Sequence, residues 1–167
     1  MITMTNEEIE KRAQRAMELF HDGFNCSQSV FTACADIYGV DQSLALRMSA
    51  SFGGGIGRMR MVCGAASGMF MLAGLANGSA TPHDSEGKMA NYRLVQQLAG
   101  EYKAKYGSLT CAELLGLAPK GQCAPQLDLD PKPAERTPEY YEKRPCAEMV
   151  GEAVRIALRT IEYNGKW

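Results

Sequence analysis

This 167-residue sequence has almost no net charge, two histidines, one tryptophan and no apolar run of membrane length. The formal net charge of -1 gives no electrostatic basis for binding nucleic acid or an anionic membrane. The uncharged run over residues 61–76 is shorter than the roughly 20 residues of a membrane-spanning helix. The first residues lack the basic region and apolar run of a secretory signal. We therefore expect a cytoplasmic protein that neither binds nucleic acid nor inserts into a membrane.

Two cysteine motifs are also missing. The sequence contains no CxxCH, so covalent attachment of haem c is not expected. It contains no CxxC either, which excludes a thioredoxin-like exchange pair close together in sequence. Six cysteines are nevertheless present. In a compartment that keeps thiols reduced, such a set more often serves metal binding or redox chemistry than structural cross-linking. Any dithiol must then be assembled by the tertiary fold.

Helical periodicity dominates the sequence, and no alternating strand pattern or internal repeat is found. Capping residues, apolar positions at helical spacing and terminating glycines predict helices over residues 5–23, 25–39, 41–48, 63–78, 89–107, 110–116 and 145–161. The predicted fold class is all-α, a compact single domain over residues 1–167. We expect about six helices around a central apolar, Gly/Ala-rich helix. Residues 118–137 are rich in proline and predict an irregular connection within that domain.

Four cysteines fall at predicted helix starts, namely Cys26, Cys63, Cys111 and Cys146. Thr110 and Glu113 predict a capping box around Cys111, and Pro145 opens the last helix. Free backbone N–H groups and the positive end of the helix dipole favour thiolate over thiol at such positions. We therefore predict that the four cysteines converge in space and share a chemical role.

The two remaining cysteines have other interpretations. Cys34 lies in mid-helix on the face of Phe31 and Tyr38, which predicts a small buried hydrophobic residue. Cys123 lies in the irregular stretch and is interpreted as a spare exposed thiol, with a resolving cysteine as the alternative.

Glycines surround Cys63. The segment SFGGGIGRMR, residues 51–60, allows positive φ and predicts a turn that positions Cys63, while an anion cradle completed by Arg58 is the alternative. Gly64 and Gly68 are one helical turn apart, as are Gly74 and Gly78, and both spacings predict close approach of a neighbouring backbone. Arg58 is therefore a candidate cofactor-binding residue.

The motifs FNCSQSV, SFGGGIGR, CGAASG, SLTCAELLG and PCAEMVGEAVRIAL together resemble the family named for its cysteine pattern, C_GCAxxG_C_C. The resemblance covers nearly the whole chain. It assigns the four family cysteines to Cys26, Cys63, Cys111 and Cys146, and the CGAxxG element to Cys63, Gly64, Ala65 and Gly68. The resemblance thus implies Gly64, Ala65 and Gly68 as further candidate cofactor-binding residues. Because the family's redox activity is inferred, the resemblance implies redox chemistry or cluster binding without naming a substrate.

The sequence is compatible with three functions. The leading hypothesis is a cytoplasmic thiol redox protein in which Cys63 attacks and another of the four cysteines resolves the mixed disulfide. Helix N–H groups and the nearby Arg58 and Arg60 are expected to lower the pKa of Cys63. The alternative is an iron–sulfur cluster or Zn²⁺ held by all four thiolates. The third possibility is a helical interaction protein with inert cysteines.

The expected partners follow from the leading hypothesis. They are a redox partner protein or a small thiol or disulfide substrate. Tyr92, Tyr102 and Tyr106 repeat on one helix face and are expected to pack there, with a homodimer interface as an open alternative.

Overall fold

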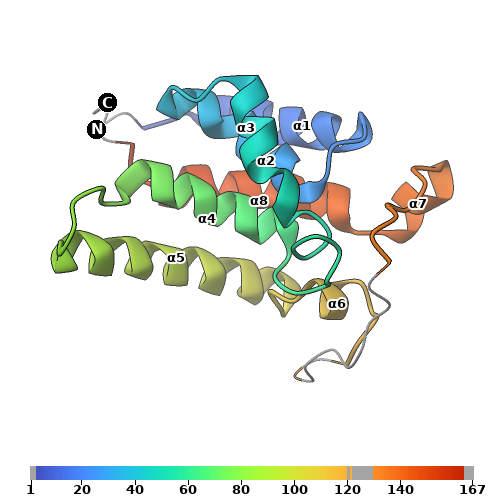
Figure 1. Ribbon diagram of the computed structural model, residues 1–167. Coiled ribbons are helices and arrows are strands. Elements are labelled where there is room, and N and C mark those ends of the chain that lie inside the picture. The colour runs from blue at the N-terminus through green and yellow to red at the C-terminus, as the bar shows by residue number, and fades with distance from the viewer. Residues whose placement is uncertain (1–2, 120, 122–129, 164–167) are drawn as a thin grey trace.

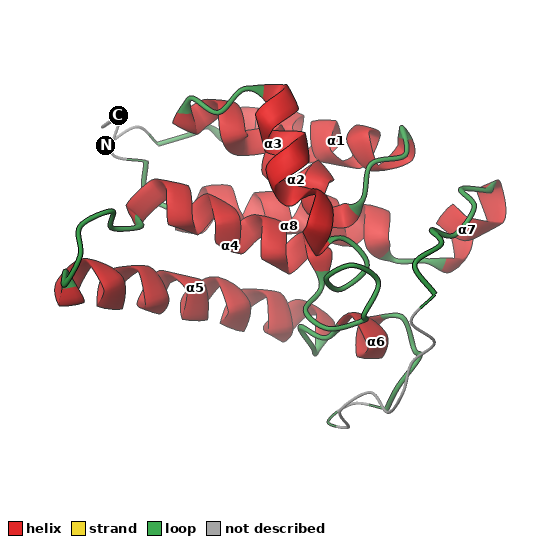
Figure 2. Ribbon diagram, viewed as in Figure 1, coloured by secondary structure: helices red, strands yellow, loops and turns green. Residues whose placement is uncertain are grey.

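Helices and loops make up the part of the chain that the computed structural model describes, residues 3–119, 121 and 130–163 (Figure 2). The α-helices are α1 (Asn6–His21), α2 (Cys26–Ala35), α3 (Gln42–Ser49), α4 (Gly64–Asn77), α5 (Ser85–Tyr106), α6 (Cys111–Leu114), α7 (Pro138–Lys143) and α8 (Cys146–Thr160). Two short 3-10 helices, η1 (Asp36–Tyr38) and η2 (Ala50–Phe52), follow α2 and α3. The all-α prediction is confirmed, and the short helix α7 is an addition that the sequence pattern does not predict.

Most helix starts are determined by local capping. Thr5 with Glu8 and Asn25 with Gln28 form complete capping boxes before α1 and α2. The prediction of a third box at Thr110 and Glu113 is wrong, because Thr110 makes no side-chain cap. Its backbone N–H instead donates to Ser108 Oγ at 2.9 Å, and the Ser108 hydroxyl donates to the Glu113 carboxylate.

The apolar helix α4 packs against α2, α5 and α8 (Figure 1). Helix α8 shares this central place because it also contacts α1, α2 and α5. A Cβ added to Gly68 would lie 2.9 Å from Val30 Cβ and 3.0 Å from the Ser27 carbonyl oxygen of α2. The predicted close approach at Gly64 and Gly68 is therefore confirmed. The same prediction is wrong for Gly74, where an added Cβ would meet no atom within 4 Å.

The outer face of α5 is only partly covered. Tyr102 is fully buried and Tyr106 is half-buried, whereas Tyr92 remains 59% exposed. The predicted packing of all three tyrosines on one face therefore holds within the chain only for Tyr102 and Tyr106. None of the helices in the described ranges is long and apolar enough to span a membrane.

Residues 130–137 have no regular secondary structure, as the proline-rich composition predicts. Residues 120 and 122–129 of the same connection lie outside the described residues, and so does Cys123.

Candidate functional site

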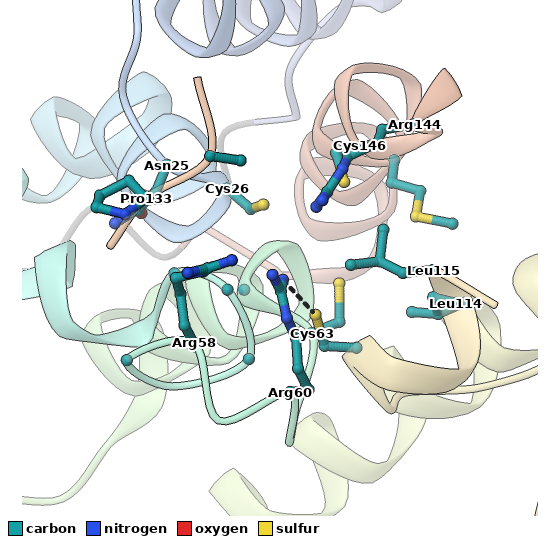
Figure 3. A pocket seen from close by; sticks show the side chains of 18 of the residues that line it. Asn25, Cys26, Arg58, Arg60, Cys63, Leu114, Leu115, Pro133, Arg144 and Cys146 are labelled. Carbon is teal, nitrogen blue, oxygen red and sulfur yellow. Dashed lines mark hydrogen bonds between the residues drawn. The ribbon is translucent and has the colours of Figure 1, made fainter. Parts of the chain in front are cut away.

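A single cavity of about 370 Å³ is lined by all four cysteines that the sequence places at helix starts (Figure 3). Cys26, Cys111 and Cys146 are the first residues of α2, α6 and α8, and Cys63 is the N-cap of α4. The predicted convergence of the four cysteines is thus present in the structure, although they are spread over most of the sequence.

A short backbone pairing brings two of these cysteines together. The N–H of Cys63 donates to the Leu109 carbonyl at 2.7 Å, and the N–H of Cys111 donates to the Met61 carbonyl at 2.6 Å. An isolated antiparallel bridge joins Val62 to Thr110 between them. Two loops that precede different helices are therefore held in register, which fixes Cys63 and Cys111 on the same wall of the cavity.

The glycine-rich segment before Cys63 forms a left-handed coil. Every residue from Gly54 to Arg58 has positive φ, including Ile56 at 66° and Arg58 at 62°. Non-glycine residues rarely adopt this region, and such strain is characteristic of functional sites. The coil is closed by hydrogen bonds such as Gly57 N–H to the Ser51 carbonyl at 2.8 Å. The interpretation of this segment as a positioning turn fits these bonds.

Gly55 shows why the coil needs glycine. It has a φ of +73°, and an added Cβ would lie 2.7 Å from Cys111 Cβ and 2.6 Å from the Met61 backbone nitrogen. A glycine also lies against Cys26, because a Cβ on Gly64 would lie 3.1 Å from Cys26 Cβ. Glycine at positions 55 and 64 therefore leaves the space that Cys111 and Cys26 occupy at the cavity wall.

Four arginines line the same cavity: Arg58, Arg60, Arg136 and Arg144. Figure 3 shows the labelled guanidinium groups of Arg58, Arg60 and Arg144 turned toward the central space that Cys26 and Cys146 also face. Arg60 is only 8% exposed and donates to the sulfur of Cys111 at 3.7 Å.

Two of these arginines fasten the 130–137 segment beside the cavity. Arg58 donates to the Asp130 carbonyl at 2.8 Å and also to the Lys132 carbonyl. Arg136 donates to the carbonyls of Phe20 and Phe24, each at 3.0 Å. Pro131, Pro133 and Ala134 of this segment line the cavity. Arg58 therefore lies at the site as predicted, but it binds backbone carbonyls of the connection.

One known protein family matches the part of the chain that contains the four cavity cysteines. The family described as "Putative redox-active protein (C_GCAxxG_C_C)" matches residues 24–160, a span that includes all four helix-start cysteines. The chain belongs to the C_GCAxxG_C_C family. Curated proteins and solved structures provide no match to the chain.

This member departs from the C_GCAxxG_C_C pattern at one point. The family name places cysteine between glycine and alanine, whereas here Cys63 precedes Gly64 and Ala65. The changed order moves the thiol, because the residue at position 64 faces Cys26 whereas the residue at position 63 is the N-cap of α4. In this chain the thiol at the cap instead lies 3.3 Å from the Tyr102 hydroxyl.

In this C_GCAxxG_C_C site the pKa values of Cys26 and Cys146 are shifted in opposite directions. The neighbouring Cys26 thiol lowers the pKa of Cys146 to about 7, although burial acts in the opposite direction. The guanidinium groups of Arg144, Arg136 and Arg60 add to the lowering of this pKa. The neighbouring Cys146 thiol and burial raise the pKa of Cys26 well above its ordinary value. The surroundings therefore favour the thiolate form more at Cys146 than at Cys26.

The pKa values of the other two cysteines of the cavity, Cys63 and Cys111, are both raised. Burial raises the pKa of Cys63, which is 7% exposed, against a lowering effect of Tyr102. Burial also raises the pKa of Cys111, although the hydrogen bond from Arg60 opposes it. The expectation that Cys63 carries the lowered pKa is therefore wrong, because burial of its sulfur outweighs the lowering effects of Tyr102 and of the first backbone N–H groups of α4.

Cys34 lies outside the cavity. It is fully buried in the core, and burial raises its pKa to about 12. Its interpretation as a small buried hydrophobic residue is confirmed.

Arg58 and Arg60 are predicted from the sequence, whereas Arg136 and Arg144 are not. Arg144 has a local signal, since it stands two residues before a cysteine at a helix start. Arg136 has no such signal, because its place depends on two distant carbonyls, of Phe20 in the last turn of α1 and of Phe24 in the loop after it.

A metal ion fits this set of side chains poorly. In the described ranges, no three His, Cys, Asp or Glu side chains are close enough to one another to bind one ion. Buried arginine beside the sulfurs also opposes a cation at this place, because like charges repel in a low-dielectric site. The arrangement thus gives the iron–sulfur and zinc alternatives no support.

Proposed function

We propose that this protein is a thiol–disulfide oxidoreductase in which Cys146 attacks a disulfide and Cys26 resolves the mixed disulfide. The observation that carries the proposal is that these two thiols line one cavity, at the starts of α2 and α8. They are also the two least buried of the five described cysteines. A thiolate is the attacking form, and a thiol with a pKa near ambient pH attacks most efficiently.

The proposed reaction balances without a cofactor. The Cys146 thiolate forms a bond to one sulfur of the substrate disulfide, and the substrate's own S–S bond breaks to release one thiolate. Cys26 then loses its proton and attacks Cys146 Sγ, which forms the Cys26–Cys146 disulfide and releases the second thiol. One substrate disulfide is reduced by two electrons, and one protein dithiol is oxidised.

The cycle needs a second thiol reductant, either a small dithiol or a redox partner protein, to restore the reduced pair. A dithiol working form suits a reducing compartment such as the cytoplasm. Cys63 and Cys111 receive no step in this scheme, because burial keeps their pKa values raised.

Reaction with a neutral disulfide, bis(2-hydroxyethyl) disulfide, tests the proposal. The reduced protein should consume the reagent near neutral pH, and mass spectrometry should find the Cys26–Cys146 disulfide in its peptides. Cys146→Ser should lower the second-order rate by roughly a hundredfold or more, because a hydroxyl is not ionised at this pH. Cys34→Ala is the matched control and should react as the wild type does.

Two results would contradict the proposal. The first is an unchanged rate in Cys146→Ser. The second is protection of all four cysteines from alkylation in anaerobically purified protein until a chelator is added, which would favour the metal-site alternative.

A further inference from the structure

We infer that the cavity selects small disulfides that carry carboxylate groups, an inference that rests on the proposed exchange function. It starts from the charge of the cavity wall. Among its described lining residues are four arginines and no aspartate or glutamate. None of these four arginines makes an ion pair with a described carboxylate. The wall is therefore strongly cationic although the whole chain is nearly neutral.

Arg60 is the strongest indication of an anionic ligand. It is more than nine-tenths buried, and its guanidinium donates to a thiol sulfur, which is a weak acceptor. Removing a guanidinium from water is costly unless an anion compensates it. A carboxylate that enters the cavity would supply the missing opposite charge through charge-assisted hydrogen bonds.

Arg144 is placed to bind the same ligand. Its guanidinium lies 4.7 Å from the centre of the Tyr140 ring, which orients it without neutralising its charge. Figure 3 shows it beside Cys146 on the side of the cavity opposite Cys26. A disulfide with its sulfur near Cys146 would therefore extend its acidic arms toward Arg144 and Arg60.

The size of the site favours a small molecule. The cavity volume of about 370 Å³ lies in the range of small-ligand sites. The 130–137 segment lies along one side of it, fixed by Arg58 and Arg136. The occupant that fits is a low-molecular-weight disulfide with carboxylate-bearing arms. The exchange described above reduces it to two carboxylates that each carry a thiol.

Three disulfides of similar length and different charge test the inference. They are 3,3′-dithiodipropionate, bis(2-hydroxyethyl) disulfide and cystamine, which are anionic, neutral and cationic at neutral pH. The wild type should react at least roughly tenfold faster with the anionic reagent than with the neutral one, and slowest with the cationic one. This preference should weaken as the salt concentration rises.

Arginine variants locate the preference. Arg144→Gln should reduce the anionic-to-neutral rate ratio several-fold, and Arg60→Lys should reduce it less because the charge is retained. The ratio is the readout because a change in the Cys146 pKa affects both reagents alike. Arg93→Gln, an exposed arginine on α5 outside the cavity lining, is the charge-matched control and should keep the wild-type ratio.

A binding experiment separates this inference from the exchange function. Suberate has the shape of dithiodipropionate but no disulfide, and it should slow alkylation of Cys146 by neutral iodoacetamide more than 1,8-octanediol does. Equal protection by the two compounds would overturn the anion inference, whether or not exchange occurs. Equal rates with all three disulfides would also overturn it and leave the exchange function standing. If suberate protects Cys146 but no disulfide reacts, the anion site stands and the exchange function fails.

Discussion

Cys34 and Cys146 lie on helices that pack against each other, α2 and α8, yet their surroundings move their pKa values in opposite directions. Burial among apolar side chains raises the pKa of Cys34 to about 12. The neighbouring Cys26 thiol lowers the pKa of Cys146 to about 7, even though Cys146 is also largely shielded from water. Burial alone therefore does not decide the pKa of a thiol in this fold. The groups beside the sulfur also decide it.

The two regions also differ in how they are built. The core around Cys34 consists of helix faces with a regular apolar pattern. The cavity wall around Cys146 consists largely of loops held by positive-φ backbone and by hydrogen bonds between distant segments. A change in these loops should therefore disturb the cavity more than the core.

The largest effect is expected for Gly55→Val, which damages the cavity region alone. The valine would adopt a left-handed backbone and meet Cys111 and the Met61 backbone. Strain and overpacking together should reduce the free energy of unfolding by about 3 kcal/mol. Urea unfolding measures this loss. The pKa of Cys146, read from alkylation rates, should rise in the same variant because Arg60 is displaced.

Gly57→Ala is the matched control for this prediction. Gly57 has a φ of +57°, and an added Cβ meets nothing within 4 Å. It should cost only the left-handed strain, about 1–2 kcal/mol. Equal losses in the two variants would mean that the contacts of Gly55 do not support the cavity.

The next largest effect is expected at Cys26, the neighbour that gives Cys146 a lower pKa than Cys34. Cys26→Ala removes the thiol that lowers the pKa of Cys146, so this pKa should rise from about 7 toward its ordinary value. Alkylation by iodoacetamide at neutral pH should slow roughly tenfold, because the thiolate fraction falls. The midpoint of the rate against pH measures the shift. Cys63→Ala should leave this midpoint nearly unchanged, and a similar midpoint in Cys26→Ala and the wild type would remove Cys26 from the proposed pair.

The contrast between the two cysteines also shows what the sequence can predict. Helix starts are local, so Asn25 with Gln28 predicts the first turn of α2 correctly, and with it the place of Cys26. The common position of four cysteines at helix starts predicts that they converge. Thr110 fails as a cap because Ser108 bonds to both its N–H and Glu113, a competition that the pattern alone does not reveal.

The pKa order of the cysteines depends on contacts between distant segments. Cys63 precedes an apolar helix with two arginines nearby in sequence, and this pattern favours it as the thiolate. The structure directs Arg60 to Cys111 and places the Cys26 thiol where it lowers the pKa of Cys146. Only the tertiary arrangement contains that information, because residues 26 and 146 lie near opposite ends of the chain.

The smallest expected effect is in the core, where Cys34 should influence stability only through its titration. An unfolded cysteine has a pKa of about 8.5, and the pKa of folded Cys34 is raised to about 12 by burial. Since the folded value is the higher one, the contribution of this thiol to the free energy of unfolding is fully present below about pH 8.5. It is lost as the pH rises toward 12.

Cys34→Ala should therefore flatten the fall in stability between about pH 8.5 and about pH 10, by up to about 1.4 kcal/mol per pH unit. Urea unfolding under reducing conditions at several pH values gives this slope. Thr32→Val is a suitable control, since this buried neighbour on α2 does not titrate and its hydroxyl has no hydrogen-bond partner among the described residues. It should retain the wild-type slope. Because Cys26, Cys63 and Cys111 also have raised pKa values, part of the slope should persist in Cys34→Ala. An unaltered slope in that variant would mean that Cys34 ionises as an exposed thiol does, and the distinction between core and cavity would fail.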